Sequence, residues 1–211
     1  MRTPDSWHTA QATVAIAVVT AIAHVIVTTF GARDTVFVLG GFIPATWSLG
    51  VHMPWALFTP LSATLLHGDY FHLILNLVML AICGRAVEGA LGPLNMILLY
   101  LVGAYVAAAA QFALDPMSGI PMVGASGAIS AVIGAYAMLF GKNRVKVADP
   151  RLALWLNALW LLVAWVLIQG AMGIVFSAGY GLLLGVGAHI GGFVAGLLLA
   201  RPMLLWRYRH A

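Results

Sequence analysis

Charged residues and cysteine are the residue types in which this chain is poorest. Only 8% of its 211 residues are Asp, Glu, Lys or Arg, whereas soluble domains carry about 25%. This shortage excludes an ordinary soluble domain, and a chain that is 63% hydrophobic is expected to lie in a bilayer. The single cysteine, Cys83, excludes an intramolecular disulfide.

Long apolar segments are what the sequence has in abundance, and a membrane-spanning helix needs about 20 such residues. They predict an all-α polytopic membrane protein, a single domain over residues 1–211 with six helices in one bundle. The predicted spans are residues 10–30, 70–84, 93–114, 126–140, 152–171 and 181–200. The first apolar run continues into a full span with no cleavage site, so no cleavable signal peptide is expected.

Residues 31–67 form a long, semi-hydrophobic first loop. Its tryptophans and prolines favour short helices at the membrane interface rather than another span. The fourth predicted span has only 15 residues, and a helix of that length reaches about 22 Å at about 1.5 Å per residue. The hydrocarbon core is about 30 Å thick. Ser126, at the start of this span, is therefore expected below the outer surface, on the floor of a cavity.

Basic residues gather on one side of the predicted topology. With six spans the two termini share a side. That side carries Arg2, Arg85, Lys142, Arg144, Lys146, Arg151, Arg201, Arg207 and Arg209, and the other carries only Arg33. The positive-inside rule then predicts that both termini are cytoplasmic and that the loop before Ser126 faces outward. The net charge of +4 thus reflects membrane orientation, and no nucleic-acid partner is expected.

Polar residues inside the predicted spans are the candidates for function. His72 and Asn76 are four residues apart and share one helical face. Small-residue stripes on the fourth and sixth spans would let these helices approach closely, which could bring Ser126 to His189. A Ser-His dyad is therefore possible, and the absence of Asp and Glu from the apolar cores argues against a triad.

Each of these residue types suits a step in acyl transfer. A serine becomes a nucleophile when a base takes its proton, and neutral imidazole is such a base. The backbone N–H of Ser126 and the side chains of His72 and Asn76 could stabilise an oxyanion. The alternative is structural: Ser126 as a helix N-cap between turn glycines, and His72 with Asn76 as an interhelical hydrogen-bonded pair.

Three motifs together resemble the rhomboid family of intramembrane serine proteases, from about His67 to Ala200. They are His72-Leu-Ile-Leu-Asn76, Gly124-Ala125-Ser126-Gly127, and Ala188-His189-Ile190-Gly191-Gly192 ending at Gly196. Their order and their spans also match, and Arg85-Ala-Val-Glu88 followed by Gly92 is similar to the family's turn after the second span.

The resemblance implies a serine endopeptidase with Ser126 as nucleophile, His189 as general base, and His72 and Asn76 as oxyanion donors. It implies a structural role for His67. Its partners would be membrane-protein substrates and the lipid bilayer, and no metal or cofactor is implied. The expected location is the bacterial inner (cytoplasmic) membrane, with the active site open to the outer side. Residues 172–179 are expected to form a cap over the site.

Two departures from the family pattern stand out. Phe58-Thr59 replaces a frequent Trp-Arg pair, so the first loop is expected to be anchored differently. Ser130 replaces an aromatic residue that packs beneath the catalytic histidine in many members. Another residue must then support His189, and Tyr136 and Tyr180 are the two that the sequence suggests.

Two other functions stay open. His67, His72 and His189 could bind zinc as three histidines with water, although Asn76 and Ser126 would then have no role. The same bundle could also bind membrane helices without catalysis. The sequence leaves the substrate, the cleavage site and the oligomeric state open.

Overall fold

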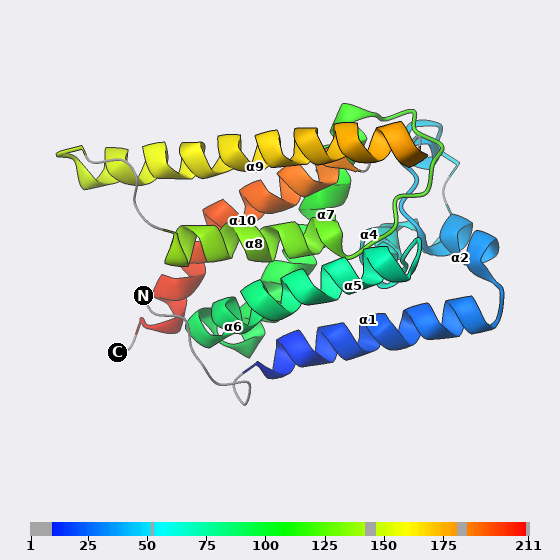
Figure 1. Cartoon of the computed structure of the whole chain (residues 1–211), viewed down its shortest axis with the longest axis horizontal. Helices are drawn as coiled ribbons and strands as arrows, with labels where there is room; N and C mark the ends of the chain where they lie inside the picture. Colours follow the sequence, from blue (N-terminus) through cyan, green and yellow to red (C-terminus); the bar gives the residue numbers. More distant parts are fainter. Residues whose placement is uncertain (1–9, 52, 142–146, 181–184, 210–211) are drawn as a thin grey trace.

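The protein folds as a bundle of helices (Figure 1). The computed structural model describes residues 10–51, 53–141, 147–180 and 185–209, with only the main chain at residues 151 and 169–180. The helices that form the bundle are α1 (Gln11–Thr29), α5 (Tyr70–Met79), α6 (Arg85–Leu91), α7 (Pro93–Leu114), α8 (Ser126–Phe140), α9 (Pro150–Tyr180) and α10 (Val186–Arg207). The fold class is therefore the predicted one, an all-α polytopic membrane protein.

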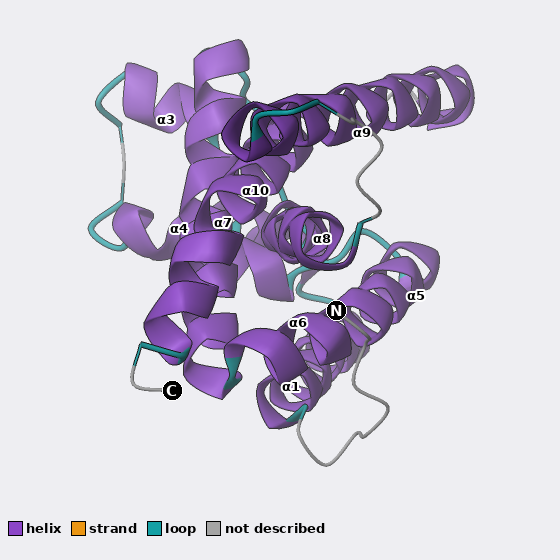
Figure 2. Ribbon diagram, turned by 90° about the vertical axis from the view of Figure 1, so that its left-hand side faces the viewer, coloured by secondary structure: helices purple, strands orange, loops and turns teal. Residues whose placement is uncertain are grey.

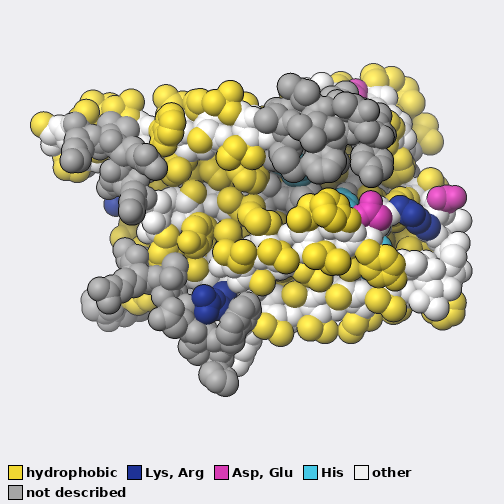
Figure 3. Space-filling view, in the orientation of Figure 1, with side chains coloured by type: hydrophobic (Ala, Val, Ile, Leu, Met, Phe, Trp, Pro, Cys, Tyr) yellow, Lys and Arg dark blue, Asp and Glu magenta, His cyan; other side chains and the backbone are white. Residues whose placement is uncertain are grey.

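Four helical stretches in the described part of the chain are long and apolar enough to cross a membrane. They are Gln11–Thr29, Tyr70–Leu91, Pro93–Leu114 and Val186–Arg207. Helix α8 and the Leu152–Ile168 part of α9 are apolar but shorter. Hydrophobic side chains cover much of the face seen in Figure 3, and the visible charged side chains lie toward its two ends. Such a surface suits lipid contact.

Helix α8 lies at the centre of the bundle, with α5, α7, α9 and α10 around it (Figure 2). Its closest neighbour is α10, because glycines allow the two backbones to touch. A Cβ at Gly192 would clash with the carbonyl oxygen of Gly127, and one at Gly196 with that of Ala131. This contact fixes the start of α8 against the start of α10.

The second predicted span is longer than the sequence suggested. Helix α5 continues through a π-helical turn, η4 (Leu80–Gly84), into α6, and the chain turns only at Gly92, where φ is +84°. The sequence predicts a short turn from Gly84 to Gly92, directly after the span 70–84, and this prediction was wrong because residues Arg85–Leu91 are helical. Gly84 serves packing instead, because a Cβ there would lie 2.9 Å from Cγ2 of Thr13 on α1.

The last two helices also differ from the predicted spans. Helix α9 continues to Tyr180, so residues 172–179 are helical and do not form the expected cap loop. An uninterrupted helix satisfies its own backbone groups in lipid, which outweighs the unfavourable glycines here. Residues 181–184, where the sixth span was expected to begin, lie outside the described residues. Helix α10 begins at Val186 and extends beyond the predicted end at residue 200, as far as Arg207.

A buried carboxylate holds α1 to α6. Glu88 is only 1% exposed. Its oxygens accept hydrogen bonds from the backbone N–H groups of Ala12 and Thr13, at 2.9 and 2.7 Å, and from the Thr13 hydroxyl at 2.7 Å. An anion at a helix N-terminus satisfies its free N–H groups and complements its dipole. Arg207 in turn donates to the carbonyls of Glu88 and Gly89, near the end of α6.

The first loop contains short helices, as predicted, and it holds the loop that precedes α8. The elements are α2 (Arg33–Gly40), α3 (Pro44–Ser48), η2 (Ala56–Phe58), α4 (Thr59–Ser62) and η3 (Ala63–Leu65). Phe42 and Met122 exchange two backbone hydrogen bonds as an antiparallel bridge. Trp55 and Tyr105 donate to the carbonyls of Leu39 and Leu57. This loop is thus anchored by a backbone bridge and by two side chains that donate to backbone carbonyls, and it lacks the Trp-Arg pair.

Candidate active site

Ser126 is the first residue of α8, and the turn before it is fixed by the first loop. The N–H of Gly124 donates to the carbonyl of Ala63 at 2.9 Å. The N–H of Ala125 donates to Nε2 of His67 at 3.3 Å. Gly124 has a φ of +123°, a backbone conformation that residues with a side chain rarely adopt. Because the first N–H groups of a helix have no acceptor within it, the turn leaves free donors beside the Ser126 hydroxyl.

His189 lies in the first turn of α10 and faces Ser126. Its Nε2 is 2.7 Å from Oγ of Ser126, a hydrogen bond whose direction depends on the imidazole tautomer. The two side chains come from helices whose backbones touch through glycine, so their separation is fixed by packing on both sides. A nucleophile within hydrogen-bond reach of a base is the arrangement that acyl transfer requires.

His72 borders the same space. The carboxylate of Asp69 caps α5 by accepting from the backbone N–H of His72 at 2.7 Å. A Cβ at Gly124 would lie 2.7 Å from Cε1 and 2.9 Å from Nε2 of His72, and 3.6 Å from Oγ of Ser126. The missing side chain of Gly124 therefore lets the His72 ring lie against the turn that leads to Ser126.

Asn76 is buried one turn further along α5. Its Nδ2 donates to the carbonyl of His72 at 2.8 Å, within its own helix. That bond uses one of the two amide hydrogens. It does not link two helices, so it gives no support to the interhelical role that the sequence left open for Asn76.

A row of imidazoles extends from the site toward α1. The ring of His67 lies between those of His72 and His24, with centroid distances of 5.0 and 6.3 Å. The ring of His24 also contacts Tyr70 at 4.7 Å. Burial, followed by the neighbouring His72 and His24, lowers the pKa of His67 from 6.5 to about 4. His67 is therefore neutral near pH 7 and can accept the hydrogen bond from Ala125.

The three-histidine zinc site that the sequence left open is not formed. Among the residues that the structure describes, no group of three or more His, Cys, Asp or Glu side chains is arranged to hold a metal ion. His189 faces Ser126, while His67 contacts the backbone of Ala125.

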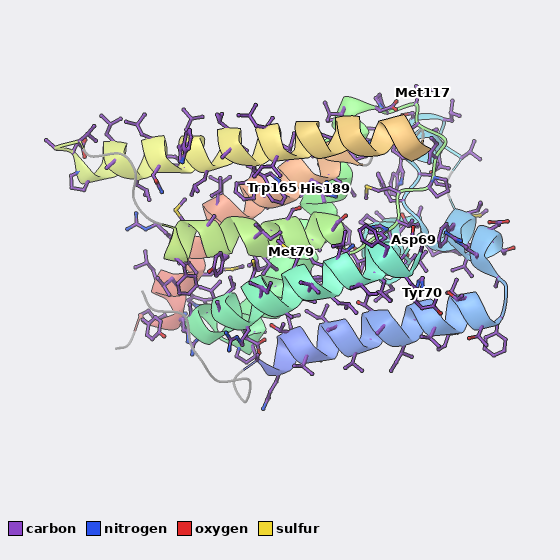
Figure 4. All side chains as sticks on the ribbon, in the orientation of Figure 1. Asp69, Tyr70, Met79, Met117, Trp165 and His189 are labelled. Atoms are coloured by element: carbon purple, nitrogen blue, oxygen red, sulfur yellow. The ribbon has the colours of Figure 1, made fainter. Side chains whose placement is uncertain are left out.

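Two residues were suggested by the sequence as the support for His189, and neither has a described contact with it. The Tyr136 ring packs against Phe140, and the Tyr180 side chain lies outside the described residues. Ser130 donates its hydroxyl to the carbonyl of Ser126 at 2.8 Å. Instead, Trp165 of α9 contacts the turn that carries His189 (Figure 4). A tryptophan inside a span needs an acceptor for its N–H, and this need was the available sequence signal.

Comparisons with known proteins identify the family to which the chain belongs. A family model described as the rhomboid domain matches residues 51–206. RHOMBOID-like protein 4 from Arabidopsis thaliana is 33% identical over 147 residues, 69% of this chain and 34% of that protein. Rhomboid protease GlpG from Haemophilus influenzae is 28% identical over 138 residues, 65% of this chain and 65% of that protein. The match thus spans less than two thirds of either relative. Because the family model covers most of the chain, the protein belongs to the rhomboid family.

Proposed function

We propose that this protein is an intramembrane serine endopeptidase, which cleaves a peptide bond in or near a transmembrane segment of another membrane protein. The observation that carries the proposal is the 2.7 Å contact between Oγ of Ser126 and Nε2 of His189 at the start of a short apolar helix. One relative, which the chain matches over 65% of its length, is named a rhomboid protease. Family membership supports the same reaction class.

His189 acts as the base and later as the acid. It takes the proton from Ser126 as Oγ attacks the carbonyl carbon of the scissile bond. The resulting tetrahedral oxyanion collapses, His189 gives the proton to the leaving amine, and an ester to Ser126 remains. A water that loses its proton to His189 then attacks this ester. The acid product leaves and the serine hydroxyl is restored, so no cofactor is consumed.

His72, Asn76 and the backbone N–H of Ser126 stabilise the oxyanion. The free N–H groups at the start of α8 are oriented donors, and the helix dipole adds to their effect. The His72 ring lies against Gly124, in the turn that leads to Ser126, and from there it donates to the oxyanion. One amide hydrogen of Asn76 is left over from its bond to His72 for the same purpose. Donors set in place before the reaction are usually the largest catalytic term.

Ser126 lies below the outer membrane surface, and both termini lie in the cytoplasm. Helix α8 has 15 residues, about 22 Å at about 1.5 Å per residue, which is less than the roughly 30 Å hydrocarbon core. Among the described basic residues, Arg85, Arg201 and Arg209 lie at the end of the bundle where α10 finishes, and Arg33 lies beyond the far end of α1. The positive-inside rule then directs the active site outward, in the inner membrane.

A fluorophosphonate probe tests the proposal on the detergent-solubilised protein. We expect covalent labelling at Ser126, with labelling and substrate cleavage lost in Ser126→Ala. His189→Ala should lose both as well, because the serine loses its base. EDTA should leave the activity unchanged. Substantial cleavage by purified Ser126→Ala, or activity that EDTA removes and zinc restores, would overturn the proposal. A folded wild type with neither labelling nor cleavage would favour a non-catalytic binder of membrane helices.

A further inference from the structure

The turn of α10 that carries His189 is contacted by three different helices. From α7, Oε1 of Gln111 accepts the backbone N–H of Ala188 at 3.4 Å. From α8, the backbone of Gly127 meets Gly192. From α9, Trp165 reaches the same turn. The contacts with α7 and α8 involve small residues along much of each helix, whereas, among the described side chains of α9, the large indole of Trp165 makes the contact with this turn.

Trp165 holds both ends of this turn. Its indole N–H donates to the carbonyl oxygen of His189 at 3.3 Å. Its ring stacks on Phe193, with centroids 5.0 Å apart and an angle of 9° between the planes. His189 and Phe193 are four residues apart, so the helical bond of this turn runs from the Phe193 N–H to the His189 carbonyl. The indole therefore lies across a single helical hydrogen bond and contacts both partners.

The backbone position of His189 decides where its imidazole lies. The Cα and Cβ of a residue set the direction of its side chain. In this structure Nε2 of His189 lies 2.7 Å from Oγ of Ser126. A displacement of about 1 Å in such a contact can cost about 10²-fold in rate. The indole N–H would be costly to leave without an acceptor in an apolar setting. The bond to His189 is therefore kept, and it resists rotation of this turn.

The residue on the α8 side cannot give this support. Ser130 is small, and its hydroxyl is bonded to the Ser126 carbonyl. Helix α9 packs chiefly on α10 in the described part of the molecule. The aromatic contact to the His189 turn therefore comes from a helix that is otherwise loosely attached.

We propose that Trp165 is a positioning residue for His189, which couples the placement of α9 to the geometry of the Ser126–His189 pair. This inference rests on the proposed function, since it assumes that the pair is catalytic. Trp165 does not touch the reacting atoms. Its effect on the reaction is exerted through the backbone of α10.

Two variants separate the contributions of the indole. Trp165→Phe keeps an aromatic ring against Phe193 but removes the N–H donor, and Trp165→Leu removes both. The matched controls are Trp160→Phe and Trp160→Leu, because Trp160 lies on the same helix and is 49% exposed. Fluorophosphonate labelling gives two readouts for each protein: the second-order rate constant, and the fraction of molecules labelled at completion. Cleavage of a transmembrane substrate adds kcat and KM separately.

We expect Trp165→Leu to lower the labelling rate constant and kcat by about 10- to 100-fold, with KM little changed and the same final fraction labelled. Trp165→Phe should fall between this variant and the wild type, and both Trp160 variants should match the wild type. A purely structural role would instead lower the final fraction and leave the rate constant of the folded molecules unchanged. That result, or wild-type rates in both Trp165 variants, would overturn the inference alone. A wild type without labelling or cleavage would overturn the proposed function and the inference with it.

Discussion

Gly124 shows at the scale of one residue how a missing side chain shapes the candidate active site. A Cβ there would lie 2.7 Å from the His72 ring, and φ is +123°. Gly124→Ala should therefore displace His72, strain the turn by about 1–3 kcal/mol, and lower the rate of fluorophosphonate labelling by about 10²-fold. The matched control is Gly119→Ala in the same loop, where a Cβ meets nothing within 4 Å. Equal labelling rates in the two variants would contradict this role.

For Asn76, the size of the loss in kcat distinguishes a catalytic role from a packing role. An oxyanion donor acts on the transition state, and removing one typically costs about 10²–10³-fold in kcat. Asn76→Ala should therefore lower kcat strongly, with little change in KM or Tm. Asn95→Ala is the control, because Asn95 bonds to the carbonyls of Leu91 and Met203, away from Ser126. The same measurements apply to His72→Ala. Near-normal kcat in the double variant of His72 and Asn76 would leave the pair with a packing role.

His67 should make stability depend on pH. Its folded pKa is about 4, below the ordinary 6.5, so between these values the unfolded chain binds a proton that the folded chain does not. Stability is then full above pH 6.5 and falls as pH drops toward 4, by up to about 3 kcal/mol. Gln can accept the Ala125 N–H but cannot titrate. His67→Gln should therefore reduce the fall in Tm across this range, and an unchanged pH profile would contradict the assignment.

At the scale of helices, the sequence predicted some boundaries well and missed others for physical reasons. The bounds of α7 and α8 coincide with the predicted segments, because Pro93 starts α7 and the glycine- and proline-containing residues 115–125 separate the two helices. The predicted spans 70–84 and 152–171 end too early, each near a glycine that the helix includes. A glycine in a span is as often a site of close packing as a turn, and only the neighbouring helix decides which. At Gly84 the neighbour is Thr13 of α1, which packs so closely that no side chain fits there.

The contact between α8 and α10 should tolerate no added side chain. A Cβ at Gly196 would meet the backbone of Ala131 and Ala135, which cannot move as a flexible side chain can. Gly196→Val should therefore push the two helices apart, lower stability by about 1–3 kcal/mol or more, and slow labelling of Ser126. Leu198→Ala, on an exposed face of α10, should change the stability by about 0.5 kcal/mol or less. Thermal unfolding in one detergent compares them, and similar Tm values would contradict the prediction.

At the scale of the whole molecule, the proposed orientation predicts where each end of the chain lies. A fluorescent-protein fusion after Ala211 should be bright, because that reporter folds in the cytoplasm. An alkaline phosphatase fusion at the same place should be inactive. A phosphatase inserted in the loop near Gly119 should be active. The reverse pattern at both sites would contradict the positive-inside argument.

The candidate site could be assembled from sequence only in part. Ser126, His72 and His189 stand in short patterns, and the structure brings their side chains around one turn. Trp165 belongs to no such pattern and acts on a backbone carbonyl, which every residue has. The anchoring of the first loop was hidden for the same reason, since the bridge between Phe42 and Met122 uses only main-chain atoms. A donor such as the Trp165 N–H can be recognised in the sequence, but the backbone group that it will bind cannot.

The glycine contacts between α8 and α10 also bear on how this sequence can drift over evolutionary time. Gly192 and Gly196 face backbone oxygens, so nearly every substitution at these positions would disrupt the helix contact and be removed by selection for function. On α1, by contrast, Val18 and Ile22 are 49% and 54% exposed, and any apolar residue would serve a lipid-facing position equally well. Divergence should therefore accumulate on the outer helices first. Between distant descendants, the α8–α10 pair would remain recognisable after the rest of the chain had lost its similarity.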